Sequence, residues 1–212
     1  MKKKEMNLLS LGKNKNILEI GCGYGEIALS ISHICNEIYC IDINILRIQE
    51  LELQKELNNK SNIHPIIANA LFLPFQKKYF DLVYSLHFIE HISKNDLRNV
   101  LIDIKKLLKP HGQLFLVTPH IFWRYLIPTH VHEYSIRELS NLLRYAGYSK
   151  IYWEIPSTKR FVLIRFMKWI PIELIIPIEF IFQKGWIRLF NIDNFRKILA
   201  FIGFNPIRLV IS

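Results

Sequence analysis

The sequence has few of the features that mark specialised classes of protein. Only three of its 212 residues are cysteines (Cys22, Cys35 and Cys40), and their odd number and spacing match neither a disulfide framework nor a zinc site. No uncharged apolar run reaches the roughly 18–20 residues of a membrane-spanning helix. The basic N-terminus lacks the apolar core of a signal peptide. We therefore expect one reduced, cytoplasmic α/β domain that buries its core without disulfides.

Positive charge is concentrated in the last quarter of the chain. The formal net charge is +10, and residues 1–156 hold 19 Lys and Arg against 15 Asp and Glu, whereas residues 157–212 hold 9 against 3. Positive charge mixed with aromatic side chains suits either a nucleic acid or an anionic membrane surface. Composition alone does not choose between these two partners.

The stretch that organises the chain is Asn16–Leu29, which reads NILEIGCGYGEIAL. Three glycines at every second position, Gly21, Gly23 and Gly25, follow an apolar β-branched run and precede a helical pattern. Glycine permits a sharp turn and the close approach of a ligand, and the first turn of a helix supplies free N–H donors. The pattern predicts a strand, a ligand-binding turn and a helix.

The glycine spacing separates two common ligands of such a turn. The dinucleotide fingerprint is G-x-G-x-x-G, but here the third glycine comes one residue early, and Glu19 precedes the first glycine by two residues. A carboxylate is unfavourable beside a pyrophosphate and suits the ammonium of S-adenosylmethionine. The spacing therefore favours S-adenosylmethionine over NAD, and an NAD-dependent oxidoreductase is the weakest alternative.

Strand and helix patterns alternate along the chain, which is typical of a doubly wound parallel sheet. The predicted strands are 17–20, 37–41, 63–67, 79–85, 113–117 and 150–155, and the predicted helices are 26–33, 44–57, 96–108 and 136–145. Residues 109–112, Lys-Pro-His-Gly, are expected to form a turn. Asp42 ends the second strand, where nucleoside-binding sheets place an acid that accepts hydrogen bonds from the ribose hydroxyls.

Five segments together resemble the class I S-adenosylmethionine-dependent methyltransferases, in the subgroup of small O- and C-methyltransferases that includes the ubiquinone-biosynthesis enzymes. These segments are LEIGCGYG, IDIN, ANALFLPF, FDLVYSLHFIEHI and LLKPHGQLFLVTP. The resemblance covers about residues 14–156. It implies a seven-stranded, mostly parallel, Rossmann-like sheet whose last strand lies antiparallel between the fifth and the sixth. It divides the chain into a cofactor-binding core (1–156), a hydrophobic basic helical insertion (157–205) and the last strand (206–212).

The resemblance also implies the cofactor ligands. They are Glu19, Gly21, Gly23, Gly25, Asp42, Ile43, Asn69, Ala70 and Ser85. The first four would line the methionine moiety, Asp42 would hold the ribose and Ile43 would pack on the adenine. Residues 69 and 70 would lie near the polar edge of the adenine, and Ser85 beside the sulfonium. Position 69 is more often Asp in this family, so Asn69 keeps an acceptor and adds a donor.

Methyl transfer needs a base only where the acceptor carries a proton. His87 and His91 leave the fourth strand beside the expected methyl group, and we predict that they are catalytic because imidazole titrates near neutral pH. His120, His130 and His132 are second candidates. His87, Glu90 and His91 share one helical face, and the ubiquinone-type enzymes have a related E-x-x-E-H stretch proposed to bind a metal, but with no fourth ligand we predict no metal site.

The leading functional hypothesis is methylation of a small, apolar or lipid-like acceptor, such as a quinone precursor, a phenol, a lipid or a glycolipid. Residues 157–205 would form core-covering helices, a lid over the acceptor or an interfacial anchor on an anionic membrane. An RNA or protein methyltransferase is an alternative, although the SLHF segment lacks N-P-P-[YF] and a catalytic cysteine, so a nucleic acid partner is not expected. A non-catalytic, membrane-associated adaptor is the other alternative. The sequence does not specify the oligomeric state.

Overall fold

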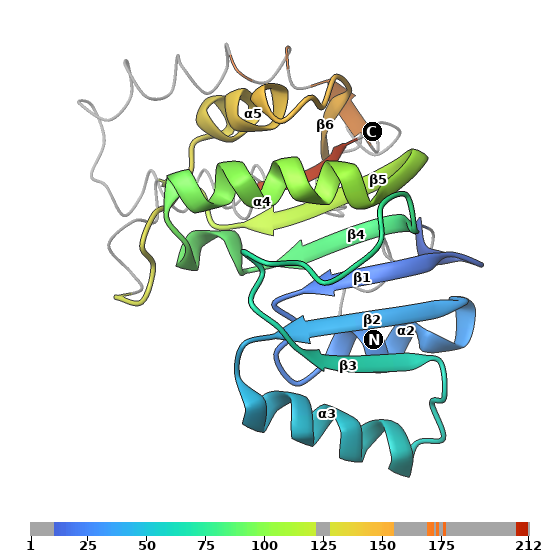
Figure 1. Ribbon diagram of the computed structural model, residues 1–212. Coiled ribbons are helices and arrows are strands. Elements are labelled where there is room, and N and C mark those ends of the chain that lie inside the picture. The colour runs from blue at the N-terminus through green and yellow to red at the C-terminus, as the bar shows by residue number, and fades with distance from the viewer. Residues whose placement is uncertain are drawn as a thin grey trace, which may run out of the picture.

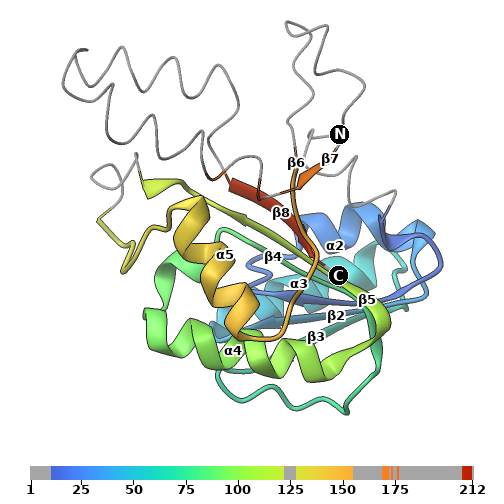
Figure 2. The ribbon, with the colours of Figure 1, turned by 90° about the horizontal axis from the view of Figure 1, so that it is seen from above.

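The structure is a computed structural model that describes residues 11–121, 128–154, 169–171, 173, 176 and 207–211. These residues form one sheet with helices on both faces (Figures 1 and 2). The strands are β1 (Asn16–Ile20), β2 (Glu37–Asp42), β3 (Ile63–Ile67), β4 (Phe80–Leu86), β5 (Leu108–Thr118), β6 (Ile151–Glu154), β7 (Trp169–Pro171) and β8 (Ile207–Ile211). The helices are α2 (Glu26–Ile31), α3 (Ile45–Leu57), α4 (Lys94–Leu107) and α5 (Ile136–Tyr145), with short 3₁₀ turns η1 (Ser32–Ile34) and η2 (Ile89–His91).

The strand order is β3-β2-β1-β4-β5-β8-β6-β7. The first five of these strands are mutually parallel, and β8 is antiparallel to both β5 and β6. The predicted α/β Rossmann-like architecture, with a late strand between the fifth and the sixth, is therefore confirmed. The predicted count of seven is one short of the eight strands described.

The additional strand is β7, which pairs antiparallel with β6. It lies inside the predicted helical insertion, so that prediction missed a strand. Of the insertion, the structure otherwise describes only Glu173 and Ile176, both helical, and the rest lies outside the described residues. The insertion and the domain boundaries therefore stay predictions.

The strand order reverses between β1 and β4. From β1 the chain adds β2 and β3 on one side, and it then returns to place β4 on the other side of β1. Ligands of open α/β sheets bind at the carboxyl ends of the strands beside such a reversal. In Figure 1 these carboxyl ends point to the left, where the loops after β1, β2 and β4 gather. The fold thus selects one edge of the sheet for the site.

Each face of the sheet has its own apolar core. On one face, α4 and α5 pack against the sheet through side chains such as Leu101 and Leu139, both fully buried. On the other face, α2 and α3 pack through residues such as Ile31 and Leu51. Figure 2 shows α4 and α5 on the side of the sheet opposite α2. Because strands buried on both faces must be apolar throughout, this arrangement explains the continuous hydrophobic runs.

Helix α5 has the predicted bounds because both of its ends carry strong local signals. The Ser135 side chain accepts a hydrogen bond from the Glu138 N–H at 3.1 Å, which is an N-cap. At the other end Gly147 has a φ of +88°, the left-handed conformation that ends many helices. These two residues define the helix without help from distant contacts.

The predicted turn at residues 109–112 is instead a bulge within β5. Leu108 pairs with Phe80, and the pairing resumes at Gln113 with Leu82. Lys109 Nζ lies 2.8 Å from Asp81 Oδ2 within this irregular stretch. The Pro-His-Gly sequence does break the ladder as predicted, but the chain continues in the same direction because Leu108 is already paired with β4.

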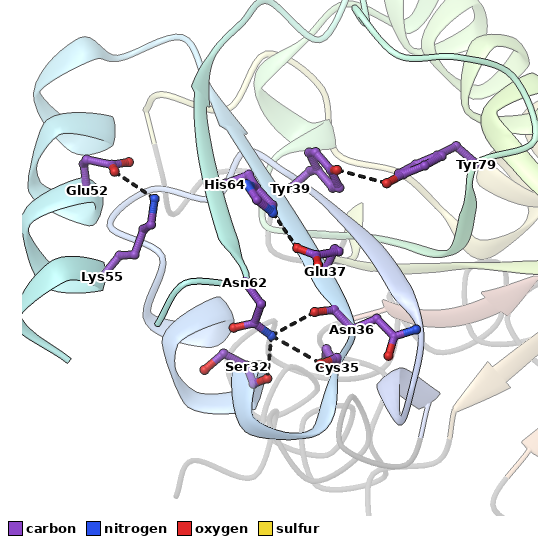
Figure 3. Close-up of polar contacts among 10 residues, drawn as sticks. All are labelled: Ser32, Cys35, Asn36, Glu37, Tyr39, Glu52, Lys55, Asn62, His64 and Tyr79. Atoms are coloured by element: carbon purple, nitrogen blue, oxygen red, sulfur yellow. Dashed lines mark hydrogen bonds and ion pairs between the residues drawn. The ribbon is translucent and has the colours of Figure 1, made fainter. Parts of the chain in front are cut away.

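A polar contact ties the segment after α2 to β3. The Asn62 side-chain amide donates hydrogen bonds to the main-chain carbonyls of Ser32, Cys35 and Asn36 at 2.9, 3.2 and 3.0 Å (Figure 3). The Ser32 carbonyl also accepts a hydrogen bond from the Cys35 N–H at 3.3 Å within η1. The Asn62 amide therefore adds to that bond and links the Cys35 and Asn36 carbonyls, at the approach to β2, to the residue before β3.

We predict that Asn62→Ala lowers the free energy of unfolding by about 1–3 kcal/mol, because it removes three hydrogen bonds to main-chain carbonyls at once. Asn62→Asp should cost more, since a carboxylate would face three carbonyl oxygens. Urea unfolding followed by circular dichroism measures both. Asn58→Ala, which removes one exposed amide contact with the Gln54 carbonyl, is the matched control and should change stability little. Equal losses at positions 58 and 62 would contradict this account.

Candidate active site

The glycine turn after β1 has a left-handed backbone at each of its three glycines. The φ angles are +71° at Gly21, +57° at Gly23 and +69° at Gly25. A Cβ at Gly21 would lie 2.8 Å from the Cβ of Phe88, and one at Gly25 would lie 2.3 Å from Leu51 Cδ1. A Cβ at Gly23 would meet no atom within 4 Å. Packing therefore requires the outer two glycines, whereas Gly23 borders open space in which a ligand could lie.

Asp42 joins the end of β2 to the glycine turn. Its Oδ2 accepts a hydrogen bond from the Gly23 N–H at 3.0 Å, and its Oδ1 accepts one from the Asn44 N–H at 2.9 Å. The Arg47 guanidinium lies 3.6 Å from Oδ2 and balances the charge of this buried carboxylate. Asp42 is thus held at the turn, in the position predicted for the ribose-binding acid.

Glu19 lies beneath the turn and is 4 % exposed. The pKa of Glu19 is raised to about 8. Burial is the largest cause and the nearby Asp42 charge adds to it, whereas contacts with Tyr84 and Cys40 lower the pKa in part. The Cys40 thiol lies 3.8 Å from Glu19 Oε2. In this environment Glu19 is mostly protonated at neutral pH, and a cation beside it would favour the ionised form.

The residues predicted to contact the adenine follow two neighbouring strands. Ile43 comes directly after β2 and is 71 % exposed, and Asn69 is exposed beyond the end of β3. The Asn69 side-chain Oδ1 accepts a hydrogen bond from the Leu71 N–H at 2.9 Å, which leaves the side-chain NH₂ group as a potential donor to a ligand. Ala70 is largely buried, so it offers mainly its main chain. The apolar face and the donor therefore lie at the same edge as Asp42.

Ser85 pairs with Ile20, the residue that precedes the glycine turn. It is 2 % exposed and lies with Ile20 and Phe88 in a packed region beneath α4. Its hydroxyl is buried without a hydrogen-bond partner among the residues that the structure describes. The expectation that Ser85 lies beside the sulfonium stays a prediction.

Of the predicted catalytic histidines, His87 directly precedes Phe88, the residue that packs on Gly21 of the glycine turn. His87 follows β4 with a φ of +56°, a conformation that is costly for a residue other than glycine and is concentrated at functional sites. Its main-chain N–H donates to the Val117 carbonyl at 2.8 Å. The adjacent Phe88 contacts Gly21, as described above. The His87 side chain is 39 % exposed, and His91 is also exposed.

The second-choice histidines fall into two groups. His120 is fully buried and forms a bridge to Tyr134, so it is not accessible to an acceptor. His130 Nδ1 lies 2.7 Å from the buried Glu133, and the His130 ring contacts the ring of His91 edge to face. His132 contacts Glu138 at 3.1 Å. The structure thus brings His130 into contact with His91, one of the predicted pair.

Sequence reasoning gave Glu90 no catalytic role, although it is fully buried at the centre of this group. Its Oε2 accepts a hydrogen bond from the Thr118 hydroxyl at 2.9 Å, and its Oε1 lies 3.4 Å from His87 Nδ1. Thr118 ends β5, so the contact joins residues far apart in sequence. In the sequence, only the spacing of three residues between His87 and Glu90 indicated that these two side chains could form a pair.

Part of this group could hold a metal ion. Among the described residues, Glu90, His91 and His130 each place one potential ligand atom within 4.8 Å of the others. This set differs from the helical face considered in the sequence, because His130 takes the place of His87. The expectation that the site works without a metal remains a prediction.

Comparison with known proteins identifies the fold. A methyltransferase-domain family matches residues 18–116, which include the glycine turn, Asp42 and the β4 loop. This chain contains a class I S-adenosylmethionine-dependent methyltransferase domain. The cofactor of the methyltransferase domain is S-adenosylmethionine, as predicted.

Two curated relatives and one solved structure illustrate the similarity. The O-methyltransferase rstn1 of Aspergillus nomiae is 30% identical over 50% of this chain and 47% of its own length. The ubiquinone biosynthesis O-methyltransferase of Pelagibacter ubique is 29% identical over 50% of this chain and 42% of its own length. A SAM-dependent methyltransferase structure from Aquifex aeolicus aligns with a TM-score of 0.62 at 18% identity, covering 73% of this chain and 83% of that one. The chain spans about half the length of the curated relatives it matches.

The described residues fit this cofactor. Gly23 borders open space, the Asp42 carboxylate has lone pairs left to accept from ribose hydroxyls, and exposed Ile43 offers an apolar surface to a purine. When bound, S-adenosylmethionine supplies an electrophilic methyl group on a sulfonium. The contribution of the methyltransferase domain is to orient the reactants and exclude water.

We predict that Gly23→Ala and Gly25→Ala affect different properties. Gly25→Ala forces a methyl group into Leu51, so it should lower the free energy of unfolding by about 1–3 kcal/mol or more. Gly23→Ala has room and costs only backbone strain of about 1–2 kcal/mol, but its methyl enters the ligand space. Calorimetric titration with S-adenosylhomocysteine should show affinity reduced about tenfold or more for Gly23→Ala. Unchanged affinity in that variant would refute the placement of the cofactor at Gly23.

The raised pKa of Glu19 predicts a pH dependence of stability. Between its ordinary pKa of 4.5 and the folded value of about 8, the folded protein holds a proton that the unfolded chain releases. Stability should therefore fall as pH rises through this window, by up to about 1.4 kcal/mol per pH unit. Glu19→Gln should remove this pH dependence. Its gain in stability over the wild type should be largest at pH 8 and above. Urea unfolding from pH 5 to 9 tests it, with exposed Glu52→Gln as control; parallel curves for wild type and Glu19→Gln would contradict it.

Proposed function

We propose that the protein transfers a methyl group from S-adenosylmethionine to a small, apolar or lipid-like acceptor. The observation that supports this proposal is the position of His87, which directly precedes Phe88, the residue packed on Gly21, has a positive φ and is partly exposed. A proton acceptor at that position suits an acceptor molecule that approaches from the β4 side of the cofactor. His91 is its neighbour and the second candidate base.

The acceptor class is supported by the relatives and by the composition of the chain. Two of the similar proteins are named as O-methyltransferases, and one of these acts in ubiquinone biosynthesis. A quinone precursor, a phenol, a lipid or a glycolipid is therefore a suitable acceptor for this chain. The hydrophobic and basic residues 157–205 would cover such an acceptor or contact an anionic membrane surface from the cytoplasmic side. In the part of the chain that the structure describes, no helix has the length and apolar character needed to span a bilayer.

The cofactor half of the proposal is tested by calorimetric titration with S-adenosylmethionine, S-adenosylhomocysteine and NAD. We expect micromolar binding of the first two ligands and none of NAD. Asp42→Ala should weaken binding about 10- to 100-fold, because it removes a charge-assisted contact with the ribose.

The matched control is Asp81→Ala. Asp81 also accepts a main-chain N–H bond, from Asn16 at 3.0 Å, but it lies at the opposite end of β4. This variant should bind the cofactor like the wild type. A folded wild-type protein that binds neither sulfonium ligand would overturn the enzyme proposal and favour the adaptor alternative. Methylation of RNA or protein, but of no small acceptor, would overturn the acceptor class.

A further inference from the structure

The contacts of Glu90 are those of a residue that holds another side chain in place. Its side chain is fully buried, and the Thr118 hydroxyl donates to one oxygen at 2.9 Å. The other oxygen, Oε1, is buried, makes no hydrogen bond within the described part of the chain and lies 3.4 Å from His87 Nδ1, within ion-pair distance. The Glu90 carbonyl accepts hydrogen bonds from the N–H groups of Val131 and His132 at 2.8 and 3.1 Å. Glu90 is thus held by Thr118 of β5 and by the segment before α5, and its remaining carboxylate oxygen lies beside His87.

A buried carboxylate needs compensation, and here the compensating groups are identifiable. Burial by itself would raise the pKa of Glu90, but the contacts with His87, its own N–H and Thr118 outweigh burial, so that its pKa is lowered. Glu90 is therefore ionised at neutral pH. Other titratable groups close to this segment could also influence it. They are His91 on the same 3₁₀ turn, and His130, His132, Glu133 and Tyr134 from the segment before α5.

An ionised carboxylate opposite Nδ1 determines which nitrogen of an imidazole carries the proton. If the imidazole turns so that Nδ1–H donates to this carboxylate, Nε2 carries the lone pair that can accept a proton. A carboxylate in this position also stabilises the imidazolium that forms when the proton is taken. The backbone of His87 adds to this orientation, because its N–H is bonded to Val117 on β5.

We propose that Glu90 is a positioning residue that holds His87 with Nε2 as the base, so that the acceptor is one that must lose a hydroxyl or phenol proton. This inference rests on the proposed function. The acceptor oxygen forms a bond to the methyl carbon as its O–H proton passes to His87 Nε2. The electron pair of the methyl–sulfur bond goes to sulfur, which leaves as a neutral thioether. The positive charge moves to the His87 imidazolium beside Glu90, and the proton is later released to water.

The first test is the tautomer of His87 in the full-length protein, measured by long-range proton–nitrogen NMR on a ¹⁵N-histidine sample. The His87 signals are assigned by their loss in His87→Asn. We expect the Nδ1–H tautomer in the wild type, with and without S-adenosylhomocysteine. In Glu90→Gln the Thr118 hydroxyl retains the amide oxygen, so the NH₂ group faces Nδ1 and shifts the proton to Nε2. An Nε2–H tautomer in the wild type would overturn the proposal even if Glu90→Gln fails to fold.

A matched control is available in the other half of the sheet. His64 Nε2 lies 2.5 Å from Glu37, a second histidine–glutamate pair that is remote from the site (Figure 3). Glu37→Gln removes this pair without touching His87. It should leave the His87 tautomer, cofactor affinity and methyl transfer unchanged. A tautomer change in both variants would mean that loss of any such carboxylate disturbs the protein, and it would overturn the specific role of Glu90.

The second test is transfer of labelled methyl groups to a panel of phenols, with 3,4-dihydroxybenzoate as the reference. Glu90→Gln should lower kcat about tenfold or more with the KM for S-adenosylmethionine changed less than about threefold. Glu90→Asp should recover part of the loss, because it keeps the charge. If the wild type binds S-adenosylhomocysteine but methylates no phenol or hydroxyl, the assigned acceptor class is wrong. Loss of S-adenosylhomocysteine binding, by contrast, would mean that the proposed function has failed.

Discussion

The hydrogen bond between the Gly23 N–H and the Asp42 carboxylate is the contact on which the site depends. It joins the turn after β1 to the end of β2, and the second oxygen of the same carboxylate bonds the Asn44 N–H. Asn44 in turn caps α3, since its side chain accepts from the N–H groups of Leu46 and Arg47. One carboxylate therefore fixes the path of the glycine turn and the start of a helix. A ribose that bonds to Asp42 meets a turn already in its binding conformation.

The two halves of the sheet, on either side of the reversal at β1, carry different groups of polar residues. The glycine turn, Asp42 and the exposed Ile43 lie on the side of β2 and β3, where they would provide the proposed contacts for a nucleoside. On the side of β4 and β5, the buried Glu90 accepts from Thr118 and lies beside His87. Such a buried polar group contributes little to stability compared with apolar packing. The proposed role of Glu90 in positioning His87 would account for its presence.

Local signals made much of this fold predictable. Strand β3 and helix α5 have the predicted bounds, because β-branched residues define the first, and Ser135 and Gly147 define the second. Asp42 was located correctly since its position at a strand end is visible in the sequence. The short edge strand β7 was missed, because its three residues pair only with β6 and carry no pattern of their own.

Other features depend on contacts that the sequence does not reveal. In β4 both faces are buried, so alternation could not show that the Ser85 side chain turns toward α4. The bulge after Leu108 depends on pairing with Phe80, whereas Pro110 and Gly112 alone suggest a turn. The role of Glu90 depends on Thr118, which is distant in sequence. Long-range pairing decides these features, and sequence patterns report mainly short-range preferences.

The position of β8 has a consequence for how the sheet assembles as the chain is synthesised. Strand β6 reaches the parallel strands only through β8, which pairs with β5 on one side and with β6 on the other. The five parallel strands can form as soon as β5 has been made, but β6 must wait until residues 155–206 and then β8 have left the ribosome. Closing a connection of this length costs little more free energy than closing a shorter one, because the cost grows only with the logarithm of loop length. The intervening segment can therefore change in length and composition during evolution while the cofactor-binding half of the sheet stays intact.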